Sequence, residues 1–199
     1  MLVFYLLTDN RCVYSSRFLK INTALKPKNH VTILNMKRAF IIHGWEGRPE
    51  EGWFPWLKKE LESRGFEVNV PSMPDSDTPV IEKWVEHIER VVGQPDAETF
   101  LVGHSIGCQA VLRYIEKLPD GQNMGGVVLV AGWIHRLDGD LSDEERAIAK
   151  PWLETPIYLE KVRTKCRNIT AIFSDDDIWV RLSEENERIF ADPLGAEII

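Results

Sequence analysis

Ser105 occupies the motif whose residue types and spacing are best suited to chemistry. The run Gly-His-Ser-Ile-Gly over residues 103–107 lies between an apolar stretch (99–102) and a helical pattern. A sharp turn from strand to helix strains the backbone at the serine, and flanking glycines avoid clashes with neighbouring chain. The turn exposes the hydroxyl above a sheet, and the helix N-terminus behind it favours developing negative charge. This context predicts that Ser105 is a nucleophile.

A second motif, His-Gly-Trp over residues 43–45, follows the apolar run 39–42. Its place after an early strand suits the other half of an oxyanion hole. There the backbone N–H groups of Trp45 and Ile106 would surround the oxyanion of a tetrahedral intermediate. Gly44 is expected to let backbone, rather than a side chain, face the substrate. The alternative is an ordinary turn at the end of a strand.

The third motif is the acidic run Asp175, Asp176 and Asp177, which follows the apolar stretch 169–173. A hydrolase triad needs a carboxylate at this position to hold the histidine tautomer and to stabilise the imidazolium. Three consecutive aspartates leave the identity of that carboxylate open, with Asp176 and Asp177 as the two choices. The alternative role is helix capping and solvation, because Asp favours loops and N-caps.

The elements that would position these motifs alternate along the chain from Met36 onward. Apolar runs predict strands over 39–42, 66–70, 99–102, 127–131 and 169–173, with the start of another over 196–199. Helical patterns are predicted over 52–64, 79–92 (with Thr78 as N-cap), 106–118, 143–150, 156–165 and 183–191. This alternation predicts an α/β fold with a mostly parallel sheet covered by helices on both faces. Such sheets place their chemistry at the carboxyl ends of the strands.

Composition narrows the class of protein. The chain has 199 residues, which suggests one domain, and its 24 basic and 31 acidic residues give a net charge of −7. That balance argues against a nucleic-acid partner. The 3 cysteines show neither disulfide-scaffold nor zinc spacing, which favours a reduced, cytoplasmic protein without a structural metal site. No apolar run approaches the roughly 18 residues of a membrane span, so no membrane association is expected.

The first 35 residues differ from the rest, because they hold five basic residues and one acidic residue. We expect residues 1–35 to be a poorly ordered basic extension, with a targeting arm as the alternative. Residues 36–199 are expected to hold the catalytic domain.

Three of the 7 tryptophans, Trp45, Trp133 and Trp179, closely follow the carboxyl ends of predicted strands. They predict an aromatic pocket for a small acyl or aryl group, with ordinary core packing as the alternative.

From residue 36 to residue 199 the chain resembles the small serine hydrolases related to retinoblastoma-binding protein nine, within the α/β-hydrolase superfamily. The motifs that carry the resemblance lie at 43–45, 103–107, 128–131, 150–152 and 174–177. It implies a three-layer sandwich in which Ser105 is the nucleophile and Asp177 the triad acid. It also implies esterase-like chemistry on a small-molecule ester, with neither metal nor organic cofactor.

The sequence departs from that family at the catalytic histidine, which follows the aspartate in hydrolases of this chain order. All five histidines precede Asp177, namely His30, His43, His87, His104 and His135. Of these only His135, after the strand predicted over 127–131, is placed to act as a substitute base. We expect the last strand and closing helix to be missing from residues 1–199, and this chain as written to be nearly inert.

Two functions therefore stay open. The first is a serine esterase represented by an incomplete chain, and the second is a non-catalytic crevice that binds a small molecule or a protein partner. The serine and aspartate motifs favour the esterase, whereas the absent histidine favours the binding protein. A thiol enzyme using Cys108 is a third alternative, although Cys108 lies in no thiol-enzyme motif.

Overall fold

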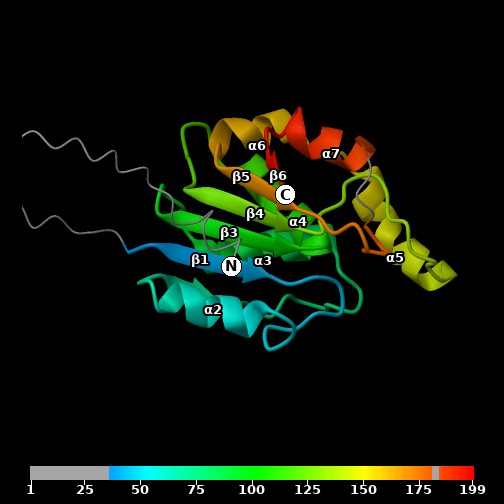
Figure 1. The fold of residues 1–199 in the computed structure, drawn as a ribbon, viewed down its shortest axis with the longest axis horizontal. Helices are drawn as coiled ribbons and strands as arrows, with labels where there is room; N and C mark the ends of the chain where they lie inside the picture. Colours follow the sequence, from blue (N-terminus) through cyan, green and yellow to red (C-terminus); the bar gives the residue numbers. More distant parts are fainter. Residues whose placement is uncertain (1–35, 181–183) are drawn as a thin grey trace, which may run out of the picture.

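A computed structural model of the chain describes residues 36–180 and 184–199, so the extension predicted over 1–35 lies outside the described residues. Six parallel strands form one sheet in the order β2-β1-β3-β4-β5-β6 (Figure 1). The strands are β1 (Arg38–Ile42), β2 (Glu67–Asn69), β3 (Thr99–His104), β4 (Gly126–Val130), β5 (Ile169–Ile172) and β6 (Glu197–Ile198). The predicted α/β fold with a parallel sheet is confirmed. The strand start expected over 196–199 is β6, which pairs with β5.

Helices lie against both faces of this sheet. They are α2 (Phe54–Glu62), α3 (Ile81–Val92), α4 (Ile106–Lys117), α5 (Asp143–Glu154), α6 (Leu159–Lys165) and α7 (Glu184–Ala191). One core cluster joins α2 to Ala39, Ile41, Val102 and Val128 on one face. The larger cluster packs α3 to α7 against the opposite face. Because the central strands are covered on both sides, they are continuously apolar. Within the described residues, no helix has the length and apolarity needed to cross a bilayer.

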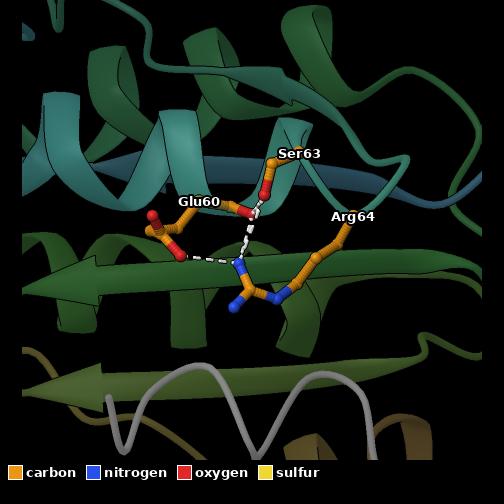
Figure 2. A network of polar contacts seen from close by, with 3 residues as sticks. All are labelled: Glu60, Ser63 and Arg64. Atoms are coloured by element: carbon orange, nitrogen blue, oxygen red, sulfur yellow. Dashed lines mark hydrogen bonds and ion pairs between the residues drawn. The ribbon is translucent and has the colours of Figure 1, made fainter.

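Side chains at and just after the C-terminal end of α2 cap the helix with hydrogen bonds (Figure 2). The guanidinium of Arg64 donates to both the carbonyl oxygen and the carboxylate of Glu60, each at 2.7 Å, and Ser63 Oγ donates to the same carbonyl at 2.8 Å. These bonds satisfy a carbonyl that lacks a partner within the helix. The chain can then reverse at Gly65, whose φ is +85°, and enter β2.

Several helix boundaries differ from the prediction by two to four residues; α6, for example, begins at Leu159 rather than at residue 156. The N-cap predicted at Thr78 is wrong, because α3 begins at Ile81 after an extended Val80 and has no side-chain cap. The Pro79 carbonyl accepts the Trp152 indole N–H at 2.9 Å, which holds Pro79 outside the helix. Helix α5 does not end at residue 150 but continues through Pro151 to Glu154, since that proline is exposed whereas Trp152 is buried. A capping box between Ser142 and Glu145 starts this helix.

Candidate active site

The turn between β3 and α4 has the strained backbone expected of a nucleophile elbow. Ser105 lies at φ 52° and ψ −123°, a left-handed conformation that few non-glycine residues adopt. A Cβ atom on Gly103 would lie 2.8 Å from the Cα of Cys108 in α4. A Cβ on Gly107 would lie 2.5 Å from the carbonyl oxygen of His43 and 2.7 Å from that of Ile42. Both flanking glycines are thus required by close backbone approach, as the motif predicts.

Backbone hydrogen bonds hold the elbow in place. The N–H of Ser105 donates to the carbonyl of Val130 at 2.9 Å, and the carbonyl of Ser105 accepts the N–H of Cys108 at 2.9 Å. The serine is therefore attached both to the end of β4 and to the first turn of α4. Its side chain is half-buried at the carboxyl ends of the strands.

The turn after β1 lies against the serine. A Cβ on Gly44 would lie 3.2 Å from the Cβ of Ser105, so the backbone at Gly44 is in contact range of the nucleophile. The N–H of Glu46 donates to Ser76 at 2.9 Å, which ties the turn to the loop after β2. Within the described part of the chain, the backbone N–H groups of Trp45 and Ile106 donate to no protein group. Neither group is therefore paired with another backbone carbonyl there, and their role as oxyanion donors remains a prediction.

His43 has both ring nitrogens occupied. Its Nε2 accepts the backbone N–H of Met73 at 3.0 Å, and its Nδ1 lies 2.8 Å from the carbonyl oxygen of Gly44. An N–H only donates and a carbonyl only accepts, so His43 is neutral with its proton on Nδ1. Burial lowers its pKa, in agreement with the neutral form. His43 is therefore a structural part of the turn and has no lone pair to offer as a base.

The His104 ring packs against the start of α2 and also borders the Gly44 turn, where a Cβ on Gly44 would lie 3.0 Å from its Nδ1. Its ring packs edge-on against Trp53 and Phe54, with ring centroids 6.0 and 5.9 Å apart. Burial lowers the pKa of His104, while the negative charge of Asp177 opposes that shift. His135, the substitute base considered from the sequence, is exposed, and no hydrogen bond joins it to Ser105 in the described residues.

Asp177 differs from the two aspartates before it. Its Oδ1 accepts the backbone N–H groups of Trp179 at 2.8 Å and Val180 at 2.9 Å. Asp175 and Asp176 are exposed, and Asp176 accepts the hydroxyl of Ser174. Asp177 is half-buried, and its charge reaches His104 beside the nucleophile. The two bonds that Asp177 accepts are those of a capping aspartate, the alternative role, and Asp177 as the triad acid remains a prediction.

The three tryptophans predicted to line a pocket have different surroundings. Trp133 is 1% exposed, and its indole Nε1 lies 3.4 Å from Ser105 Oγ. Trp45 is half-buried and donates its indole N–H to the Asp77 carbonyl at 2.9 Å. Trp179 is 43% exposed and lies directly over Gly139. Only Trp133 is brought to the nucleophile, whereas Trp45 and Trp179 belong to the loops around it.

A buried polar network beneath the elbow is missing from the sequence-based prediction. Gln109, which is fully buried, donates to the carbonyl of Ile134 at 3.3 Å and accepts from Arg113 at 3.0 Å. The Arg113 guanidinium also donates to the carbonyls of Trp152, Thr155 and Pro156 around the end of α5. A Gln and an Arg four residues apart in the otherwise apolar start of α4 were the available signal.

Cys108 does not fit the alternative of a thiol enzyme. Its side chain is fully buried, its Sγ lies 3.4 Å from the Val130 carbonyl, and burial raises its pKa. A reactive cysteine needs an accessible thiolate. Among the residues described, no group of three or more His, Cys, Asp or Glu side chains is arranged to hold a metal ion.

Comparisons with known proteins agree with this geometry. The family model described as serine hydrolase matches residues 39–199. Serine hydrolase RBBP9 of Rattus norvegicus is 30% identical over 164 residues, which are 81% of this chain and 82% of that protein. YdeN of Bacillus subtilis (strain 168) is 37% identical over 101 residues, which are 51% of this chain and 53% of YdeN. The chain thus aligns with about half the length of YdeN.

Solved structures share the fold. The crystal structure of the ydeN gene product from B. subtilis superimposes with a TM-score of 0.72 at 28% identity, covering 82% of this chain and 83% of that one. Est1E from Butyrivibrio proteoclasticus superimposes with a TM-score of 0.62 at 17% identity, covering 82% and 77% of the two chains. The elbow at Ser105, the parallel sheet and the family match agree: the chain belongs to the serine hydrolase family of RBBP9 and YdeN, within the α/β-hydrolase superfamily.

Proposed function

We propose that this protein is a serine esterase that cleaves small-molecule esters through an acyl-enzyme on Ser105. The observation that carries the proposal is the strained elbow, which holds Ser105 at φ 52° at the N-terminus of α4. Strain of this kind is characteristic of functional sites, and the elbow exposes a serine hydroxyl as a nucleophile.

The residues around Ser105 take the remaining parts of the reaction. Ser105 Oγ attacks the ester carbonyl, and the N–H groups of Trp45 and Ile106 hold the resulting oxyanion. Asp177 orients the imidazole that accepts the serine proton and later protonates the leaving alcohol. Trp45, Trp133 and Trp179 contact the acyl or alcohol part of the substrate. Water then attacks the acyl-enzyme, and the proton returns to Ser105.

The esterase proposal requires an imidazole next to Ser105, and the alternative function does not. None of the described histidines hydrogen-bonds to Ser105: His43 and His104 are engaged in hydrogen bonds and packing, and His135 is exposed. This observation favours a second candidate, a crevice that binds a small molecule or a protein partner without catalysis.

Chemical rescue tests the two against each other. The 199-residue chain and its Ser105→Ala variant are incubated with 4-nitrophenyl acetate, with and without added imidazole. Imidazole supplies the missing base, so the native chain should release 4-nitrophenolate faster than the variant and carry an acetyl group on Ser105. The variant corrects for hydrolysis by imidazole alone, and peptide mass spectrometry locates the adduct.

Either outcome has a clear meaning. Imidazole-dependent acetylation of Ser105 supports the esterase. Equal rates for the native and variant chains, with no adduct on Ser105, exclude the nucleophile assignment. The non-catalytic crevice would then be the better account.

A further inference from the structure

The hydrogen bond between Trp133 and Ser105 indicates a role for Trp133 other than contact with substrate. Indole Nε1 carries one hydrogen and has no accepting lone pair, so this contact must run from Trp133 to the serine oxygen. Among the described residues, Trp133 is the group that donates a hydrogen bond to Ser105 Oγ, with an N···O distance of 3.4 Å. The serine oxygen is the acceptor in this bond, so the hydroxyl proton is not used in it and stays free for a base to remove.

The backbone is strained at Ala131, two residues before this tryptophan. Ala131 continues the sheet by donating to Ile172 at 2.9 Å, and then turns at a left-handed φ of 50°. A non-glycine residue rarely adopts this conformation, and it persists where the surrounding structure imposes it. The turn at Ala131 directs the following residues back over α4 rather than out into solvent.

Packing and hydrogen bonds on either side then fix Trp133. A Cβ on Gly132 would lie 3.0 Å from the ring of Phe190 and 3.3 Å from the Cβ of Cys108, so this peptide is confined between α7 and α4. The carbonyl of Ile134 accepts from the buried amide of Gln109. The chain is thus held on each side of Trp133, and the indole itself is enclosed, with an exposure of 1%.

We propose that Trp133 is a catalytic residue whose indole N–H assists the departure of Ser105 Oγ from the acyl-enzyme. The inference rests on the proposed function, because it requires Ser105 to be acylated. In deacylation, water adds to the acyl carbon, the C–Oγ bond breaks, and Oγ takes the electron pair and then a proton. An ester oxygen is a weak acceptor, so the hydrogen bond strengthens as charge develops on Oγ, and it stabilises the transition state more than the acyl-enzyme.

The two halves of the reaction should therefore respond differently. In acylation, Oγ begins as a hydroxyl that already accepts the indole proton, so loss of the N–H changes little. In deacylation, a hydrogen bond to a developing charge is lost, which corresponds to a slowing of about 10- to 100-fold. If deacylation limits turnover, kcat and KM fall together while kcat/KM is preserved.

The test removes the N–H and keeps the ring. Trp133 is replaced by 3-benzothienylalanine, in which sulfur stands in place of the indole N–H, and separately by Phe. Trp152→Phe is the matched control, because Trp152 is also 1% exposed and its indole N–H donates to Pro79 at 2.9 Å, away from Ser105. Each full-length chain is acetylated with 4-nitrophenyl acetate and imidazole and desalted. Decay of the adduct in imidazole buffer is followed by intact-protein mass spectrometry.

We expect the benzothienyl chain to form the Ser105 adduct at the native rate, and both Trp133 variants to lose the adduct about 10- to 100-fold more slowly. Trp152→Phe should lose it at the native rate. Native decay in the benzothienyl chain would overturn the role of Trp133, as would slower acylation in that chain. Absence of any Ser105 adduct in the native chain would overturn the proposed function itself, and this result is distinct from the other two.

Discussion

The imidazole of His43 donates from Nδ1 to the carbonyl oxygen of Gly44 across 2.8 Å. The described peptide bonds are all trans, so the N–H of Trp45 points opposite to that carbonyl. His43 thereby fixes the direction in which the proposed oxyanion donor faces. The bond from Met73 to Nε2 at 3.0 Å holds the required tautomer.

Acid should destabilise the fold through this histidine. Burial lowers the pKa of His43 below its ordinary value of 6.5. At pH values between the lowered pKa and 6.5, the unfolded chain therefore binds more protons than the folded chain. The free energy of unfolding is therefore expected to fall as the pH decreases through 6.5 toward the lowered pKa. Urea titrations across this range should show a shallower fall in His43→Gln, with the exposed His135→Gln as control. An unchanged pH dependence in His43→Gln would contradict the prediction.

The elbow should reject a single methyl group. Gly107→Ala places a carbon 2.5 Å from a backbone oxygen of His43, and we expect a loss of about 1–3 kcal/mol in the free energy of unfolding. Gly126→Ala is the matched control, because its new methyl would meet atoms no closer than 3.3 Å. Urea unfolding measures both. Equal stability of the two variants would show that the close approach at Gly107 is not required.

The two candidate carboxylates can be separated by isosteric substitution. Asp177→Asn keeps an oxygen for the N–H groups of Trp179 and Val180 but removes the charge. Loss of a triad aspartate costs about 10⁴-fold with a fixed histidine, so we expect imidazole-dependent acylation of Ser105 to fall at least about 10-fold. Asp176→Asn should leave acylation unchanged. The reverse pattern would assign the carboxylate to Asp176.

Both described cysteines should be unreactive in the folded protein. Cys108 and Cys166 are at most 1% exposed, and burial raises the pKa of Cys166 to about 12. In a Cys12→Ser chain, Ellman's reagent at mildly alkaline pH should find no reactive thiol until the protein is unfolded in guanidinium chloride. Prompt reaction of the folded chain with one equivalent would mean that Cys108 or Cys166 becomes accessible by local opening.

The sequence was sufficient for the fold class and for the location of the elbow. Apolar residues identified the strands, as continuous runs in the central strands and as an alternating pattern around β2. The steric need for Gly103 and Gly107 followed from the motif. Element ends were less predictable where tertiary contacts decide them. The Trp152 indole excludes Pro79 from α3, and burial of Trp152 extends α5 past a proline.

The finer features of the site depend on side-chain direction, which spacing along the chain does not encode. Asp176 and Asp177 are adjacent in sequence, yet Asp176 is exposed whereas Asp177 is half-buried and accepts two backbone N–H groups. Trp133 was expected to line a pocket, but the strained turn at Ala131 brings its N–H to the nucleophile. Such contacts between separate strands need the packed fold.

The parallel sheet also determines at which stage of synthesis and folding the residues of the site come together. Trp45 precedes Ser105 by 60 residues and Asp177 follows it by 72, because each comes from the end of a different strand. During synthesis Ser105 therefore leaves the ribosome well before Asp177, the proposed triad carboxylate, and contacts this distant in sequence form late in folding. A partly made chain carries the serine without the charge that would direct a base to it. The nucleophile thus acquires its full setting only once β5 has joined the sheet.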